Sequence, residues 1–99
     1  MNTDMVRLNL ILTQEDMKRI QQYPDRMSLD LHGKTRREAK KLLNNVINTI
    51  RHPFTMEVIH GYNHGTALKD MIFEEVINPR IISKDVPSYN IGETFLYIN

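Results

Sequence analysis

The sequence predicts an α/β two-layer sandwich, with a βαβαββ core of about four strands and two helices. Two segments have apolar residues at helical spacing, and a short extended segment ending in His-Gly precedes each of them. The tail then holds two further extended segments. Strands that alternate with helices pair in parallel, because a helical crossover returns the chain to the same end of the sheet.

The composition predicts one small domain. At 99 residues the chain has a length typical of a single unit, which we divide into an N-terminal extended arm with a short helix (1–26) and a main domain (27–99). The absence of cysteine excludes disulfides and thiolate metal sites. Because no long apolar run and no secretory leader pattern is visible, we expect a cytoplasmic protein without a membrane partner.

The charge is close to neutral at +1, whereas a nucleic-acid-binding domain is usually strongly basic. Its distribution is uneven, however, since cations gather directly after the first His-Gly and acidic residues gather in the second predicted helix. The cations are Lys34, Arg36, Arg37, Lys40 and Lys41, and the acids are Asp70, Glu74 and Glu75. One end of the molecule is therefore expected to be locally positive, although a solvated helix face explains such cations equally well.

The N-terminal segment is predicted to be extended. Residues 5–12 place every second side chain, from Val6 to Leu12, on one side, which is typical of a strand. An exposed apolar strand can pair with another chain, so the expected state is a monomer or an arm-mediated dimer. Residues 13–16 then indicate a capped short helix that ends before Tyr23-Pro24, with a linker at 25–26.

The first core strand is predicted at 27–32. Leu29 and Leu31 point to one face, and Ser28, Asp30 and His32 point to the other, more open face. A capping box at 35–38 then begins the first helix. The stripe of this helix is Ala39, Leu42, Leu43, Val46, Ile47 and Ile50.

The second half repeats this order. Residues 54–60 form an apolar run typical of a buried strand, and the loop 61–65 leads to Thr66, a candidate helix cap. The helix that follows, to about residue 76, carries the stripe Leu68, Met71, Ile72 and Val76. Strands are predicted at 80–83 and 94–98, separated by turn-forming residues at 87–92.

Both His-Gly pairs fall where open α/β sheets bind ligands, beyond the carboxyl ends of parallel strands. Helix N-termini at this edge favour an anion, and glycines let the protein backbone approach that anion closely. Histidine exchanges protons near neutral pH, while a carboxylate on the same strand face, here Asp30, can orient the imidazole. These residue types suit phosphodiester cleavage. On RNA the nucleophile is the substrate's own 2′-hydroxyl, and on DNA an activated water is needed, usually with a metal.

Other readings of these histidines stay open. A lone histidine at a strand end is more often structural, His64 is either a third site member or a loop residue, and His52 before Pro53 is expected to be structural. By ligand type alone, His32, His60 and His64 fit zinc, but no metal-binding spacing is recognisable.

The first motif is Leu-Asp-Leu-His-Gly at residues 29–33, and the second is Ile-His-Gly at 59–61, followed by Gly65 and Leu68-Lys69. With these motifs the chain resembles the small MutS-related (Smr) domain over about residues 27–98. The resemblance implies a βαβαββ sandwich similar to the C-terminal domain of a bacterial translation initiation factor. It also implies nicking or cleavage of DNA or RNA. The family's second motif commonly reads His-Gly-Lys-Gly-x-Gly, whereas residues 60–65 here read His-Gly-Tyr-Asn-His-Gly.

The functional hypothesis is therefore an Smr-type endonuclease or nicking enzyme acting on RNA or DNA, with Asp30, His32 and His60 as catalytic residues. The alternative is a non-catalytic module that binds nucleic acid or the ribosome. No cofactor is required, and a divalent metal is left open. The residues expected to bind nucleic acid or phosphate are Gly33, Lys34, Arg36, Arg37, Lys40, Lys41, Gly61, Tyr62, Asn63, His64, Gly65 and Lys69, with Tyr62 able to stack on a base.

Overall fold

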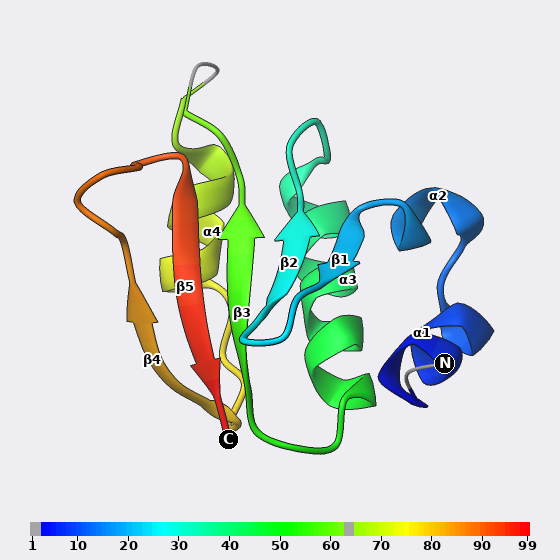
Figure 1. The fold of residues 1–99 in the computed structure, drawn as a ribbon. Coiled ribbons are helices and arrows are strands. Elements are labelled where there is room, and N and C mark those ends of the chain that lie inside the picture. Colours follow the sequence, from blue (N-terminus) through cyan, green and yellow to red (C-terminus); the bar gives the residue numbers. More distant parts are fainter. Residues whose placement is uncertain (1–2, 63–64) are drawn as a thin grey trace.

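The computed structural model describes residues 3–62 and 65–99. Within them the chain forms an α/β unit in which a mixed five-stranded sheet, in the order β1-β2-β3-β5-β4, has helices behind one of its faces (Figure 1). The strands are β1 (Ile20–Gln22), β2 (Met27–Asp30), β3 (Phe54–Ile59), β4 (Ile81–Asp85) and β5 (Glu93–Ile98). The helices are α1 (Thr3–Ile11), α2 (Gln14–Met17), α3 (Arg36–Thr49) and α4 (Ala67–Glu74). The predicted α/β class is confirmed.

The parallel pair β2 and β3 lies at the centre of the sheet. Met27 pairs with Met56 and Asp30 with Ile59, so both strands end at the same edge. Helix α3 makes the crossover between them, as the strand–helix alternation predicted. The remaining pairs, β1 with β2, β3 with β5, and β4 with β5, are antiparallel.

The core lies between this sheet and helices α3 and α4. The predicted stripe of α3 is confirmed, since every residue of it from Ala39 to Ile50 is buried. The capping box is also present: Glu38 N donates to Thr35 Oγ1 at 3.2 Å and Thr35 N donates to Glu38 Oε1 at 2.9 Å. Leu29 and Leu31 face the helices and are fully buried, which leaves Asp30 on the open face as expected.

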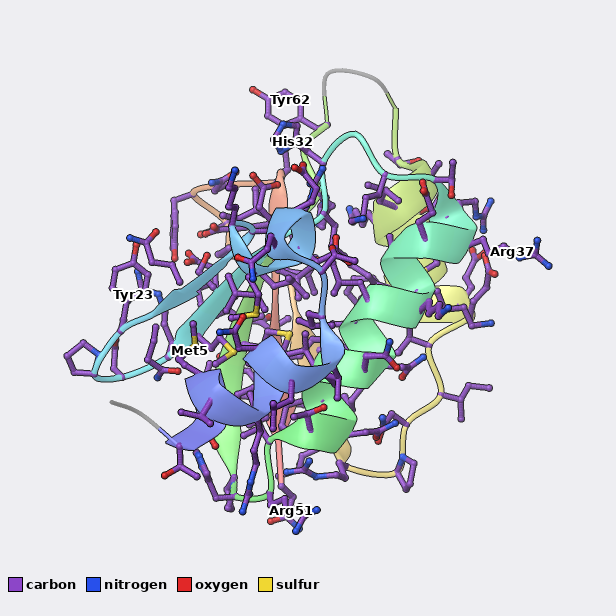
Figure 2. The ribbon with its side chains drawn as sticks, turned by 90° about the vertical axis from the view of Figure 1, so that its right-hand side faces the viewer. Met5, Tyr23, His32, Arg37, Arg51 and Tyr62 are labelled. Atoms are coloured by element: carbon purple, nitrogen blue, oxygen red, sulfur yellow. The ribbon has the colours of Figure 1, made fainter. Side chains whose placement is uncertain are left out.

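The prediction of an extended arm at residues 5–12 is wrong, because Thr3–Ile11 is the helix α1. Leu8 and Leu12 belong to a period of two, but with Met5 they also follow the spacing of three and four residues that a helix needs. Leu8 is fully buried, Met5 and Leu12 pack against the core, and Leu10 is exposed. Figure 2 shows Met5 on the inner side of α1, which lies beside α3. Strand pairing between two copies therefore does not follow from this segment.

The sheet has one strand more than expected, because residues 20–22 pair with β2 as β1. Ile20 was predicted to belong to the short helix, but that helix ends at Met17 and Ile20 lies opposite Leu29. The tail strands are found close to their predicted positions, at Ile81–Asp85 and Glu93–Ile98. In the part of the chain that the structure describes, no helix is long and apolar enough to cross a membrane.

Two carboxylates lie on neighbouring strands at the open face of the sheet. Glu93 of β5 is buried at 5% exposure, and Glu57 of β3 accepts a hydrogen bond from Arg26 Nε at 3.2 Å. Burial, followed by the hydrogen bond and charge of Glu57, raises the pKa of Glu93. A carboxyl group whose pKa is raised by folding stabilises the fold at pH values below its pKa in the unfolded chain, about 4.3. That contribution is lost as the pH rises through its pKa in the folded protein.

The substitution Glu93→Gln is therefore expected to stabilise the protein relative to the wild type more at pH 7 than at pH 4. Urea unfolding at both pH values measures this difference. Glu74→Gln, which removes an exposed carboxylate from α4, is the matched control and should give a smaller change. An equal effect of Glu93→Gln at both pH values would contradict the assignment.

Helix α1 contacts the loop after α3 through a charged pair. His52 Nε2 lies 2.6 Å from Asp4 Oδ2, and His52 Nδ1 lies 2.8 Å from the carbonyl oxygen of Pro53. The hydrogen bond to Asp4, with that to Pro53, raises the pKa of His52. A histidine whose pKa is raised by folding stabilises the fold at pH values below its pKa in the unfolded chain, about 6.5. That stabilisation is lost as the pH rises through its pKa in the folded protein.

The destabilisation caused by Asp4→Asn is expected to be larger at pH 6 than at pH 9, since the charged partner exists only at the lower pH. Urea unfolding of the wild type and the variant at both pH values gives the loss of unfolding free energy at each pH, and the difference between the two losses is the contribution of the charged pair. Amide hydrogen exchange in α1 should show the same loss of protection. A penalty that does not change with pH would refute the ion pair.

Candidate active site

The carboxyl ends of β2 and β3 open onto a cavity of about 690 Å³, a volume within the usual range for ligand pockets. It is enclosed by the turn after β2, the turn after β3 and the start of α4. Figure 2 shows His32 and Tyr62, one from each turn, at the same end of the molecule. The lining residues are His32, Gly33, Lys34, Thr35, Arg36, Ile59, His60, Gly61, Tyr62, Gly65, Ala67 and Leu68.

Asp30 and His32 form a hydrogen-bonded pair beside this cavity, with His32 in its lining. Asp30 Oδ1 lies 2.5 Å from His32 Nδ1 and also accepts from the backbone N–H of His32 at 3.0 Å. Because a carboxylate only accepts, this hydrogen bond places a proton on Nδ1, and in the neutral form of the ring Nε2 is then the acceptor. The His32 side chain is 69% exposed, so Nε2 is accessible. The arrangement is that of a proton-transfer residue held by a carboxylate.

Glycine is required in both turns by backbone conformation. Gly33 has φ +82° and Gly61 has φ +76°, values that side chains other than glycine rarely adopt. A Cβ at either position would meet no atom within 4 Å. The two His-Gly pairs thus turn the chain sharply at the end of each strand, and the space beside them stays open for a ligand.

His60 is enclosed much more than His32. It is 6% exposed, and its Nδ1 donates to Gly61 O at 2.9 Å while its Nε2 lies 2.9 Å from the Thr94 hydroxyl. Burial, with the nearby charge of Lys69, lowers the pKa of His60, which favours the neutral ring. Both nitrogens are used within the fold, and His60 holds the end of β3 against β5. That it assists catalysis stays a prediction.

The two helix starts that face the cavity differ. At α3 the capping box occupies the N–H groups of Thr35 and Glu38, and the Glu38 carboxylate already supplies a negative charge there. At α4, Thr66 precedes the helix as predicted, but its hydroxyl donates to Asp70 Oδ2 at 2.9 Å and caps no backbone group. The first turn of α4 also carries a carboxylate, that of Asp70, so the two helix starts differ in that the start of α4 has no side-chain cap on its N–H groups.

Several of the predicted phosphate-binding cations already have partners. Lys34 Nζ lies 2.9 Å from Asp16 Oδ1, and the guanidinium of Arg36 contacts the Glu75 carboxylate. A second, more open groove of about 600 Å³ lies beside the cavity, and Arg36 lines both. Its other lining residues are Arg37, Lys40, Lys41, Asn44 and Glu75. Figure 2 shows Arg37 projecting outward from α3.

Tyr62 forms one wall of the cavity and is held by the backbone of Gly92. A Cβ at Gly92 would lie 3.2 Å from Tyr62 Cδ1, so the ring rests against a position where only glycine fits without displacement. Gly92 O also accepts hydrogen bonds from the N–H groups of His60 and Gly61 at 3.0 and 2.9 Å.

The predicted site residues Asn63 and His64 lie outside the described residues, and Lys69 of α4 does not line the cavity.

Sequence reasoning missed the residues that support the site from elsewhere in the chain. Asp16 and Arg19 come from the N-terminal segment, and Gly92 and Thr94 come from the start of β5. Only Gly92 carried a signal, as a turn glycine before a strand. The others are ordinary polar residues in sequence, and long-range pairing alone brings them to the site.

The described ranges contain no group of three or more His, Asp or Glu side chains that could hold a metal ion. His64 lies outside those ranges, so the zinc alternative is not tested. Whether a divalent ion takes part is a question for a chelator experiment.

Release of Lys34 from Asp16 is expected to strengthen the binding of a polyanion. In Asp16→Asn the ammonium loses its partner, so affinity for a single-stranded oligonucleotide should rise at low salt. The slope of log K against log salt should steepen by about 0.7, the value for one further contact with a single strand. Fluorescence anisotropy over a salt series measures both quantities. Asp25→Asn makes the same change of charge at an exposed site beside Arg26, and equal effects of the two variants would contradict a local role.

The chain was also compared with known proteins. No family model matches it, and no curated protein is found to match it either. The resemblance to Smr domains therefore rests on the sequence motifs alone.

Proposed function

We propose that this chain is an endonuclease of the Smr type that cleaves a phosphodiester bond of nucleic acid, with RNA as the preferred substrate. One observation carries the proposal: His32, whose Nδ1 lies 2.5 Å from Asp30 Oδ1, lines a cavity of about 690 Å³. The pair leaves one exposed imidazole nitrogen for a substrate. The order β2-α3-β3-α4-β4-β5 agrees with the βαβαββ layout that the Smr resemblance implies.

The chemistry follows from the state of the His32 ring. With the proton on Nδ1 held by Asp30, neutral Nε2 accepts the proton of a ribose 2′-hydroxyl, and the 2′-oxygen attacks the adjacent phosphorus. The bond from phosphorus to the 5′-oxygen breaks, that oxygen takes up a proton from a water molecule, and the protonated His32 ring returns its extra proton to solvent. The products are a 2′,3′-cyclic phosphate and a free 5′-hydroxyl. DNA lacks the 2′-hydroxyl, so its cleavage needs an activated water.

Binding of the strand is assigned to groups around the cavity. The start of α4 supplies N–H groups and a positive dipole end for one phosphate. Arg37, Lys40 and Lys41 extend a cationic surface along α3 for further phosphates. Tyr62, 55% exposed, offers a ring on which an unpaired base can stack, a contact worth about 1–3 kcal/mol in proteins that bind single strands.

The test is cleavage of single-stranded RNA and DNA by the wild type and by His32→Asn, Asp30→Asn and the double variant. Loss of a general base is expected to lower the rate about 10²- to 10⁴-fold. His52→Asn is the matched control, because His52 also contacts a carboxylate but belongs to the end of the molecule that holds α1. It should keep the wild-type rate. Undiminished cleavage by a folded double variant would refute the assignment.

The same assay decides between the metal-free route and the alternatives. Cleavage of RNA that persists in a chelator, with a cyclic phosphate end, is the expected result. Full loss of cleavage in the chelator would replace it by a metal-dependent route. Binding that produces no new strand ends after long incubation would instead support a non-catalytic nucleic-acid-binding module.

A further inference from the structure

The N-terminal segment reaches into the candidate active site through one side chain. Arg19 follows α2, and its Nη1 donates to the carbonyl oxygen of His32 at 2.8 Å and to that of Asp30 at 3.1 Å. The backbone joins the same residues, since Asp30 N donates to Arg19 O at 2.9 Å. Arg19 thus holds both ends of the short stretch that carries the Asp30–His32 pair.

This contact controls the geometry on which the pair depends. Asp30 Oδ1 accepts both the backbone N–H and the Nδ1–H of His32, and it does so only while the chain between the two residues is bent. Directing the carbonyls of Asp30 and His32 to one donor keeps that bend. A guanidinium suits the task, because its donors lie in a rigid plane and its charge is permanent.

From this geometry we infer that Arg19 is a positioning residue, which sets the orientation and tautomer of His32 by clamping the two carbonyls. Arg19 does not line the cavity, and its Nη1 is directed at carbonyl oxygens, so it is not assigned to bind phosphate. The consequence for catalysis rests on the proposed function. The consequence for the His32 ring does not.

The variants are Arg19→Met, Arg19→Lys and the control Arg37→Met, in which an exposed arginine of the groove is removed. Arg19→Met is expected to fold, because it also removes the buried Arg19 Nε, which has no hydrogen-bond partner among the described residues. Amide spectra and thermal unfolding check this. Arg19→Lys keeps the charge but not the planar fork and should restore the wild-type properties only in part.

Two readouts separate positioning from general structural damage. Imidazole ¹⁵N spectra of His32 should show the Nδ1–H form in the wild type and in Arg37→Met, and a mixture of tautomers in Arg19→Met, with the His52 and His60 signals unchanged. In cleavage, Arg19→Met should lower kcat about 10- to 100-fold with KM within about twofold. Arg37→Met should instead raise KM and reduce the salt slope by about 0.7.

The outcomes keep the two proposals apart. If the wild type cleaves nothing but the His32 tautomer still changes in Arg19→Met, the proposed function fails and the positioning role stands. If the His32 spectrum of Arg19→Met matches that of the wild type, the positioning role is overturned, whatever the activity. A reduced salt slope in Arg19→Met would overturn it too, in favour of a phosphate contact.

Discussion

The parallel pairing of β2 with β3 is the constraint on which the candidate site depends. With Asp30 opposite Ile59 in the register, both strands end at the same edge of the sheet. A parallel pair requires a helical crossover, and α3 provides it. Each strand then leads through a glycine at positive φ, Gly33 or Gly61, toward a helix start. The cavity results from this topology, because two turns and the starts of α3 and α4 are brought together at one edge.

Charge in this molecule is balanced within the fold. The formal charge of +1 conceals cations that are already paired, Lys34 with Asp16 and Arg36 with Glu75. A phosphate that binds in the cavity must compete with these carboxylates, which makes its binding sensitive to salt. Arg37, Lys40 and Lys41 line the neighbouring groove. Electrostatic attraction is therefore expected to be stronger along α3 than inside the cavity.

Local features of the fold and site were predictable from the sequence, and long-range ones were not. Helix α3 carries its periodicity and its capping box within adjacent turns. Asp30 and His32 are two residues apart, and strand alternation over 27–32 predicted a shared face; β2 in fact ends at Asp30, and His32 meets the Asp30 carboxylate from the turn that follows. The spacing of residues 5–12 fits a helix as well as a strand, and β1 has only three residues. Arg19 and Thr94 reach the site through tertiary pairing, which leaves no pattern in sequence.

The described part of the chain contains two His–Asp pairs of nearly equal length, and their surroundings determine which one fits the proposed catalytic role. His52 lies 2.6 Å from Asp4, and its second nitrogen lies 2.8 Å from Pro53 O, so both nitrogens serve the docking of α1. Among the described residues, the His32 ring has a hydrogen-bond partner at Nδ1 alone, 2.5 Å from Asp30 Oδ1, and its turn borders the large cavity. A carboxylate beside an imidazole is thus not sufficient. A free second nitrogen, space for a substrate and a fixed turn must coincide, and they coincide at His32.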